Sequence, residues 1–182
     1  MSAETVESHR VYSGRIINVD VDTVRFPNGS VGSLEMVRHP GAAGIVPFVT
    51  DPRDQDPEIL LLRQYRYAAR GTLYEIPAGR LDPGEAPEAC ARRELKEETG
   101  CTAKRVEPLL TIYTTPGFTD ERIHLFLASG LDHGDTGHES DEFIELETLR
   151  LSRALTLIKR GEIQDGKSVV GILYAAEFRA RV

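Results

Sequence analysis

The chain has 182 residues, a formal net charge of −7 and a hydrophobic fraction of 40%. This length fits one domain with room for a small appendage, and the composition excludes a chain that is disordered throughout. The acidic balance argues against a protein that binds nucleic acid through a basic face. A small anionic substrate stays open, because a bound cation can reverse the local charge.

The apolar runs and the cysteines of the chain predict its cellular location. No apolar run approaches 18 residues and the first ten residues are polar, so we expect neither a membrane-spanning helix nor a secretory signal. The two cysteines, Cys90 and Cys101, fit neither a disulfide framework nor a metal motif. We therefore predict reduced thiols, a cytoplasmic location and no membrane partner.

Residues 1–40 have the pattern of a small antiparallel β subdomain. Apolar and polar residues alternate over 19–22, which is the period of a half-buried strand. The pair Asn28 and Gly29 then predicts a hairpin turn, since both residues tolerate positive φ, and residues 31–37 can return as the next strand. So small a unit would bury little surface by itself, which favours a homodimer.

Residues 41–182 have the mixed pattern of a layered α/β (α+β) domain. Helices are predicted where apolar residues recur at helical spacing or where end signals flank a run, at 87–99, 151–158 and 167–178. Short apolar runs bounded by turn residues predict strands at 44–49, 59–62, 72–76, 109–114 and 123–128. We expect a polar loop over 132–141.

The predicted helix 87–99 carries three glutamates along one stripe. Glu94 and Glu98 are four residues apart and project from the same face, and Glu97 lies beside them. Carboxylate oxygens are the ligands that Mg²⁺ and Mn²⁺ prefer, and a divalent ion removes the repulsion between them. The plainer interpretation is a solvated acidic face that is neutralised by nearby cations, which are Arg92, Arg93 and Lys96.

These glutamates belong to a longer pattern that resembles the Nudix box. The box reads G-x5-E-x7-R-E-U-x-E-E-x-G-U, where U is a bulky apolar residue, and every fixed identity is present between Gly79 and Gly100. A chance match of so many fixed residues has a probability of about 10⁻⁹ per starting point. Only the last position, Cys101, is an unusual apolar residue.

The resemblance implies the fold and chemistry of a Nudix hydrolase. That family folds as an α/β/α sandwich around a mixed sheet, and it cleaves nucleoside diphosphates linked to another moiety with the help of Mg²⁺ or Mn²⁺. Its metal ligands, carboxylates and one backbone carbonyl, match Ala78, Glu94, Glu97 and Glu98. Glu97 is also a candidate base, and the supporting catalytic pair of the box matches Glu85 and Arg93.

Flanking residues resemble the ADP-ribose pyrophosphatase subgroup. Pro116 lies sixteen residues after Gly100, a spacing that marks this subgroup. The resemblance implies hydrolysis of the diphosphate of ADP-ribose to AMP and ribose 5-phosphate, and a homodimer that exchanges its N-terminal subdomain. The residues that it assigns to substrate binding are Tyr65, Arg66, Glu75, Pro116, Gly117 and Phe118.

Several of these assignments have plainer interpretations. Tyr65 and Tyr67 can be aromatic residues of the core or of a dimer interface, and the Pro116–Gly117 pair can be a simple turn. Arg66 can form a surface salt bridge. A guanidinium also suits a bidentate grip on phosphate, which favours Arg66 as a substrate contact.

The general base is expected on the acidic loop that follows the predicted strand 123–128. By resemblance, a glutamate of this loop approaches the attacking water. Glu142 is the first candidate and Glu139 the second, while Ser140 stands where some relatives have another acid. The other interpretation is a loop whose charges are simply solvated.

Two other functions fit the same residues. One is hydrolysis of another nucleoside diphosphate sugar, such as GDP-mannose or ADP-glucose, or of an oxidised nucleotide, which needs only a different base and sugar pocket. The other is a sensor that binds ADP-ribose without cleaving it. Sensors of this kind usually lose box carboxylates, whereas this chain keeps all of them.

Overall fold

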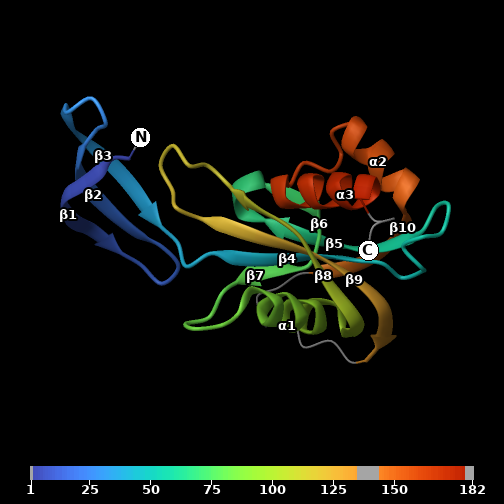
Figure 1. The fold of residues 1–182 in the computed structure, drawn as a ribbon. Helices are drawn as coiled ribbons and strands as arrows, with labels where there is room; N and C mark the ends of the chain where they lie inside the picture. The colour runs from blue at the N-terminus through green and yellow to red at the C-terminus, as the bar shows by residue number, and fades with distance from the viewer. Residues whose placement is uncertain (1, 135–143, 179–182) are drawn as a thin grey trace. The chain divides into compact units, whose positions relative to one another are not determined.

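The structure, a computed structural model, describes residues 2–134 and 144–178 (Figure 1). Its internal contacts divide the chain into two units. The first unit contains residues 2–41 together with Tyr113–Arg122, and the second contains Ala42–Ile112 and the described residues from Ile123 onward.

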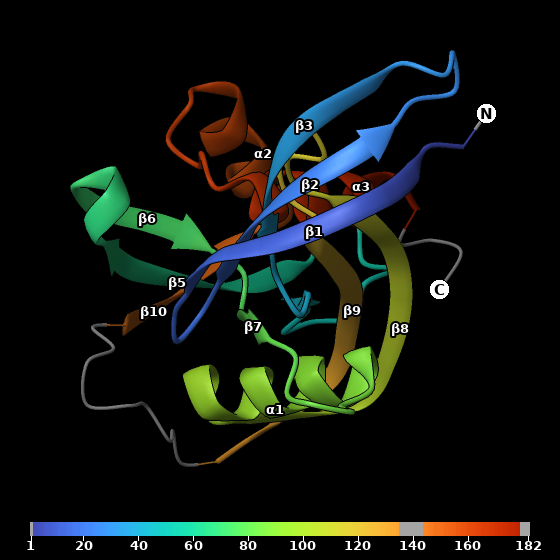
Figure 2. The same cartoon turned by 90° about the vertical axis from the view of Figure 1, so that its left-hand side faces the viewer.

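Three antiparallel strands form the sheet of the first unit (Figure 2). They are β1 (Glu4–Ser13), β2 (Asn18–Arg25) and β3 (Val31–Arg38), with β2 in the middle. In the turn between β2 and β3, Gly29 has a φ of 84° and Asn28 accepts hydrogen bonds from Ser30. The predicted hairpin is therefore confirmed.

The buried face of β2 carries aspartates. Asp20 and Asp22 are 5% and 4% exposed, whereas Val19 and Val21 are half-buried. Arg38 binds both carboxylates, and its Nε lies 3.0 Å from Oδ2 of Asp20. The predicted alternation is confirmed, and the charged side of the strand is the inner one because arginines neutralise it.

A mixed four-stranded sheet lies in the middle of the second unit, in the order β7-β4-β9-β8. β4 (Ala42–Pro47) runs parallel to β9 (Arg122–His133) and antiparallel to β7 (Ala78–Arg80). β8 (Cys101–Tyr113) is the strand beyond β9. This parallel pairing brings together segments that are about eighty residues apart, which a local pattern cannot predict.

An antiparallel three-stranded sheet completes the second unit. Its strands are β10 (Ile144–Arg150), β5 (Glu58–Arg66) and β6 (Gly71–Glu75), with β5 in the middle. A short 3₁₀ turn, η1 (Tyr67–Ala69), joins β5 to β6.

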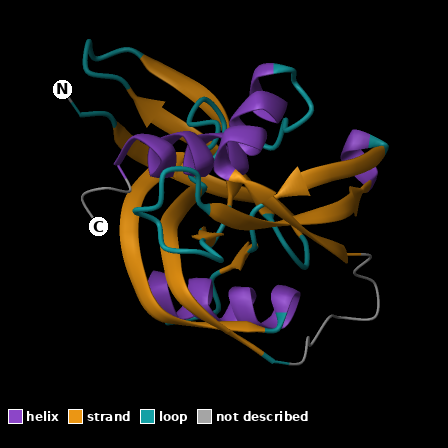
Figure 3. Ribbon diagram, turned by 90° about the vertical axis from the view of Figure 1, so that its right-hand side faces the viewer, coloured by secondary structure: helices purple, strands orange, loops and turns teal. Residues whose placement is uncertain are grey.

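Helices lie on both faces of the four-stranded sheet (Figures 1 and 3). α1 (Pro87–Thr99) packs on one side of β4, and α3 (Gly166–Phe178), which α2 (Leu151–Lys159) contacts, packs on the other. Among the described residues, no helix combines the length and the apolar character that crossing a membrane requires.

Alternate residues of β4 supply the two layers of the core. Ile45 belongs to the cluster that contains Leu95 of α1, and Val46 belongs to the cluster that contains Ile172 of α3. Successive side chains of a strand point to opposite faces, so one buried strand can pack against helices on both sides. The predicted α/β/α sandwich around a mixed sheet is therefore confirmed.

Candidate active site

The box begins on β7, passes through a turn and ends in α1. β7 pairs with the first residues of β4, where Ala78 lies opposite Gly44. Pro87 is the first residue of α1, and Gly100 ends the helix with a φ of 71°, while its N–H donates to the carbonyl of Lys96 over 2.8 Å. Proline suits a first turn and glycine suits this left-handed position, which explains the position of the helix in the sequence.

Arg93 lies among the box carboxylates. Its Nε and Nη2 each lie 3.0 Å from an oxygen of Glu85, and its Nη1 donates to Glu94 over 2.7 Å and to Glu97 over 3.0 Å. The hydrogen bonds from Arg93 to Glu85, together with one from the N–H of Asp82, lower the pKa of Glu85 to about 2. The structure thus brings the predicted pair together, and Glu85 remains ionised at neutral pH.

Glu98 is 3% exposed and faces the start of the box. Its Oε2 accepts a hydrogen bond of 2.9 Å from the N–H of Ala78. The buried carboxylate of α1 and the backbone of β7 therefore meet, as expected if the Ala78 carbonyl and the Glu98 carboxylate are to share one ion.

Glu94 lies directly against Gly79. A Cβ atom added to Gly79 would lie 1.8 Å from Oε1 of Glu94, far inside van der Waals contact. Only glycine leaves room for this carboxylate, whose side chain is 13% exposed. Gly79 therefore forms one wall of the space that Glu94 occupies beside Ala78.

The oxygen donors of this site suit Mg²⁺ or Mn²⁺. Such ions are commonly held by one or two carboxylates, and water and substrate phosphates complete the coordination. Glu94 and Glu98 with the backbone of Ala78 supply that set, and Glu97 lies at the solvent side with 48% of its side chain exposed. Among the described residues, no three acidic, histidine or cysteine side chains gather closely enough to hold an ion by themselves.

Cys90, the cysteine within the box segment, is unreactive at neutral pH. Cys90 and Cys101 are both buried and free. Burial and the charges of Glu85 and Glu94 raise the pKa of the Cys90 thiol to about 12. The thiol therefore stays protonated at neutral pH, which excludes it as a nucleophile.

Arg66 and Glu75 bind each other. Nε and Nη2 of Arg66 lie 2.7 and 2.8 Å from the two oxygens of Glu75, which is 2% exposed at the end of β6. The salt bridge predicted for Arg66 therefore exists, but its partner is buried.

The two tyrosines beside Arg66 lie at the surface. Tyr65 and Tyr67 are 53% and 88% exposed, so the interpretation of either residue as part of the core is wrong.

Sequence reasoning missed the groups that complete this ion pair. Lys167, in the first turn of α3, also binds Glu75, and its Nζ lies 3.0 Å from Asp165. A lysine in a first turn opposes the helix dipole, and this anomaly was the available signal. Asp165 precedes the helix and accepts hydrogen bonds from the N–H and the hydroxyl of Ser168, the pattern of an N-cap.

Pro116, Gly117 and Phe118 belong to the first unit by their contacts. The carbonyl of Phe118 accepts a hydrogen bond of 2.8 Å from the N–H of Val37, and Thr119 forms an isolated bridge with the same valine. Phe118 is 52% exposed. The segment forms a turn, since the N–H of Phe118 bonds the carbonyl of Thr115 over 3.1 Å, and its contact with substrate stays a prediction.

The two loop candidates for the general base, Glu139 and Glu142, lie outside the described residues.

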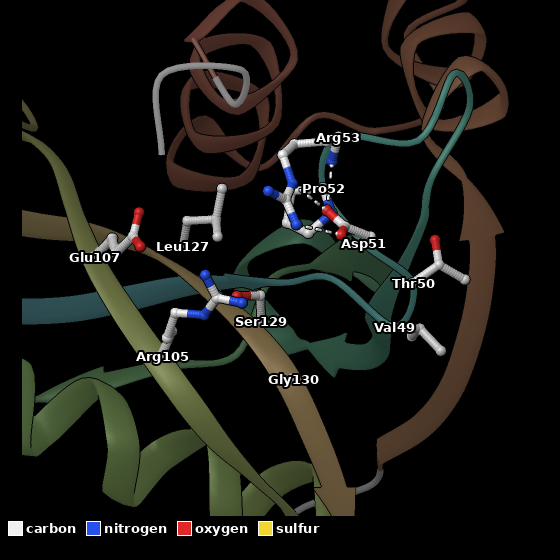
Figure 4. A pocket seen from close by; sticks show the side chains of 10 residues that line it. All are labelled: Val49, Thr50, Asp51, Pro52, Arg53, Arg105, Glu107, Leu127, Ser129 and Gly130. Carbon is white, nitrogen blue, oxygen red and sulfur yellow. Dashed lines mark hydrogen bonds and ion pairs between the residues drawn. The ribbon is translucent and has the colours of Figure 1, made fainter.

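A separate cavity of about 230 Å³ opens past the carboxyl end of β4 (Figure 4). It is lined by residues 49–53 with parts of β8 and β9, and Asp51 and Arg53 form an ion pair in its wall. β7 pairs with the opposite end of β4, at Ala42–Gly44. The cavity is therefore distinct from the box carboxylates.

Known proteins resemble this chain over nearly its whole length. The sequence pattern of the NUDIX domain matches residues 38–169, and that of the nucleoside diphosphate sugar hydrolase N-terminal domain matches residues 4–33. The methanol dehydrogenase activator of Bacillus methanolicus is 39% identical over 173 residues, which cover 94% of this chain and 91% of that protein. The ADP-ribose pyrophosphatase of Bacillus subtilis is 39% identical over 176 residues, covering 96% and 92%.

A solved structure has the same fold. The crystal structure of an ADP compounds hydrolase superposes with a TM-score of 0.83 at 21% sequence identity, and the match covers 100% of this chain and 96% of that one. The NUDIX pattern spans more than half of the chain, and the box residues meet around α1 and β7. The chain therefore belongs to the Nudix family and is a Nudix hydrolase.

Proposed function

We propose that this enzyme hydrolyses the diphosphate of ADP-ribose to AMP and ribose 5-phosphate. Water adds to one phosphorus, the bridging P–O bond breaks, and the protons of the water pass to a base and to the leaving phosphate. The 39% identity to an ADP-ribose pyrophosphatase over 96% of the chain supports this substrate.

The observation that carries the proposal is the contact between Glu98 and Ala78 beside Glu94. It joins two carboxylates and a backbone segment at one point, where Mg²⁺ or Mn²⁺ would be held by Glu94, Glu98 and the Ala78 carbonyl. When bound, such an ion would neutralise the charge of the diphosphate and make a water more acidic. Arg93 fixes Glu94 and Glu85 in place, and Glu97 is a further candidate ligand or base.

Candidate bases and substrate contacts complete the proposal. Glu142 is the first choice for the base that receives a proton from the water, and Glu139 is the second. Replacing the base with glutamine is expected to lower kcat strongly, whereas the same replacement of a solvated carboxylate is expected to leave kcat nearly unchanged. Two groups of residues are proposed to contact the substrate. Tyr65, Arg66 and Glu75 precede the box in the sequence, and Pro116, Gly117 and Phe118 follow it.

Another nucleoside diphosphate sugar is the second candidate substrate. The match of residues 4–33 to a nucleoside diphosphate sugar hydrolase N-terminal domain favours it. The phosphate chemistry would be the same, and only the base and sugar contacts would differ. A sensor without turnover has less support, because every box carboxylate is present.

We also propose that residues 1–40 serve dimerisation, that residues 41–182 form the catalytic domain, and that the enzyme is a cytoplasmic homodimer. β1 is exposed along its whole length, and Val6, Val11 and Val31 of this sheet are each more than half exposed. Apolar side chains grouped on one small sheet favour contact with a second copy. The two buried free cysteines fit a reducing compartment. Light scattering tests the dimer, and a monomeric mass would contradict it.

The function is tested by product analysis. Purified protein is incubated with Mg²⁺ and ADP-ribose, GDP-mannose, ADP-glucose or an oxidised nucleotide, and kcat/KM is compared. We expect AMP and ribose 5-phosphate from ADP-ribose with the highest kcat/KM. The test variant is Glu98→Gln, which is expected to lower kcat at least about a hundredfold. The matched control is Glu88→Gln on the exposed face of α1, which is expected to keep full activity. Binding of ADP-ribose without any AMP would overturn the proposal.

A further inference from the structure

A buried carboxylate, that of Glu75, is shared by two cations from different parts of the chain. Arg66 of β5 donates to both of its oxygens, and Lys167 of α3 donates to Oε2 from a side chain that is only 12% exposed. Burial alone would raise the pKa of Glu75, but Arg66 and Lys167 hold it below the ordinary value. Glu75 is therefore an ion in the interior whose orientation depends on both partners.

Lys167 is itself fixed from the helix side. Its Nζ lies 3.0 Å from Oδ2 of Asp165, and the same oxygen accepts hydrogen bonds from the N–H of Ser168 at 3.0 Å and from its hydroxyl at 2.5 Å. The unfavourable position of a cation in a first turn is offset by two carboxylates, Asp165 and Glu75. The ammonium group is thus held at a single place.

The same turn of α3 holds the strand that leads into the box. The hydroxyl of Ser168, which is fully buried, accepts a hydrogen bond of 2.8 Å from the N–H of Ile76. Two residues later, the N–H of Ala78 binds Glu98. Glu75 and Ile76 are therefore tied to α3, and Ala78 is tied to the metal-site carboxylate of α1.

Arg66 connects this network to the box site. Its Nε and Nη2 are used by Glu75, while its Nη1 has no partner among the described residues, and 42% of the side chain is exposed. The hydrogen bonds from Arg66 to Glu75 raise the pKa of Arg66, and the negative charges of Glu98 and Asp165 add to this effect. Glu75, which Arg66 binds, lies three residues before Ala78, whose N–H binds Glu98, so Arg66 is linked to the box site through this segment, and its Nη1 remains for an anion.

We propose that Lys167 is a positioning residue that orients Glu75, so that Arg66 presents its remaining nitrogen to the diphosphate of the substrate. Lys167 acts through Glu75, because its side chain is only 12% exposed and Glu75 and Asp165 accept two of its three N–H donors. Asp165 and Ser168 belong to the same device, since they fix the first turn of α3. This inference rests on the proposed diphosphate hydrolysis.

A double-mutant cycle between Lys167 and Glu75 tests the inference. We expect K167M to raise KM about tenfold with kcat changed less than threefold, because a substrate contact is displaced while the metal ligands remain. In an E75Q background, the same substitution is expected to change KM less than twofold, since Lys167 acts through Glu75. Mn²⁺ affinity, followed by electron paramagnetic resonance, is expected to stay unchanged.

The matched control is Lys159→Met at the exposed end of α2, which is expected to leave KM unchanged. A KM for K167M within twofold of the wild type, or an equal rise in the E75Q background, would overturn the inference. So would a loss of thermal stability without any rise in KM. If K167M does not fold, K167R takes its place, and a KM rise of threefold or more supports the inference while an unchanged KM opposes it.

A measurement without substrate separates this inference from the proposed function. The Nε–H of Arg66, assigned in nuclear magnetic resonance spectra by its loss in R66K, is expected to exchange with solvent at least about tenfold faster in K167M. Unchanged exchange would show that Lys167 does not orient the pair. If the wild-type enzyme cleaves none of the substrates, the proposed function fails, whereas the exchange result still decides the role of Lys167.

Discussion

Arg93 and Glu85 form a two-pronged ion pair across the turn of the box, with each of two nitrogens 3.0 Å from a carboxylate oxygen. The third nitrogen reaches Glu94 and Glu97 on the helix, so one guanidinium joins the turn to the glutamates that are proposed to hold the metal. Lysine keeps the charge but lacks the fork. We expect Arg93→Lys to lower kcat/KM at least about tenfold, because Glu94 loses its fixed partner.

The matched control is Arg92→Lys. Arg92 pairs with Glu88 one turn earlier on α1, and its Nη1 donates to the carbonyl of Ala103 over 2.9 Å. An exposed pair of this spacing contributes only about 0.3–0.5 kcal/mol, so activity is expected to stay within twofold. Equal losses in the two variants, measured side by side in steady-state assays, would mean that the fork of Arg93 has no special role.

The low pKa of Glu85 predicts a pH dependence of stability. The carboxyl has a pKa of about 2 in the folded chain, against an ordinary value of 4.5, because Arg93 and the N–H of Asp82 bind the ionised form. A lowered pKa stabilises the fold above the ordinary value, and this stabilisation is lost as the pH falls from 4.5 toward 2. Urea unfolding of the wild type and of Glu85→Gln should therefore differ most near pH 6, with the wild type more stable, and the difference should shrink below pH 4.5 and be nearly lost at pH 2. A constant difference across that range would contradict the assignment.

Local signals predicted the part of the site that is continuous in sequence. The helix over 87–99 has its predicted bounds, because Pro87 and Gly100 mark its ends. β10 was not predicted at all, and β8 starts at Cys101 instead of residue 109. Pairing with a distant partner decides such strands, as β10 with β5, and a single run of residues carries little of that information.

The partners of the buried charges were the other feature that the sequence pattern did not predict. The composition of residues 19–22 predicted alternation but not which side is buried, and the arginine that decides it, Arg38, lies on another strand. The same holds for Lys167, whose partner Glu75 is 92 residues away. A buried charge needs a partner from a distant segment, and the sequence does not name that partner.

Arg38 predicts that residues 113–122 fold together with the N-terminal sheet. It binds Asp20 and Asp22 of β2, and its Nη1 lies 3.3 Å from Asp120. Arg38→Met removes the cation that joins Asp20 and Asp22 to Asp120, while Arg10 still binds Asp20, so we expect the sheet to lose stability at this point. Hydrogen exchange is expected to accelerate in β2 and in residues 115–120 together, while α1 and β4 keep their protection.

Arg25→Met at the exposed end of β2 is the control for that experiment, and it is expected to leave exchange unchanged in both segments. Acceleration in β2 alone would show that the stability of residues 113–122 does not depend on Arg38. Acceleration throughout α1 and β4 as well would show that the two units unfold as one.

Gly79 and Glu94 give the sharpest separation between activity and stability. A methyl group at Gly79 would lie 1.8 Å from Oε1 of Glu94, so the carboxylate must move. The atom in the way is the end of a flexible side chain, and its displacement costs little folding energy compared with a clash in the core. We expect Gly79→Ala to lower Mn²⁺ affinity and kcat/KM at least about tenfold, because a carboxylate ligand leaves its place, while the thermal midpoint falls by only a few degrees.

Gly71→Ala is the matched control, since a Cβ there would meet nothing closer than 3.9 Å and the backbone φ is not positive. Its activity and metal affinity are expected to equal those of the wild type. If Gly79→Ala kept full Mn²⁺ affinity, Glu94 would not be a ligand, and the acidic stripe of α1 would be a solvated face after all. If it lost stability as steeply as activity, the clash would extend to the backbone of β7. A loss of Mn²⁺ binding with little loss of stability is expected only if Glu94, in its position beside Gly79, is a ligand of the ion.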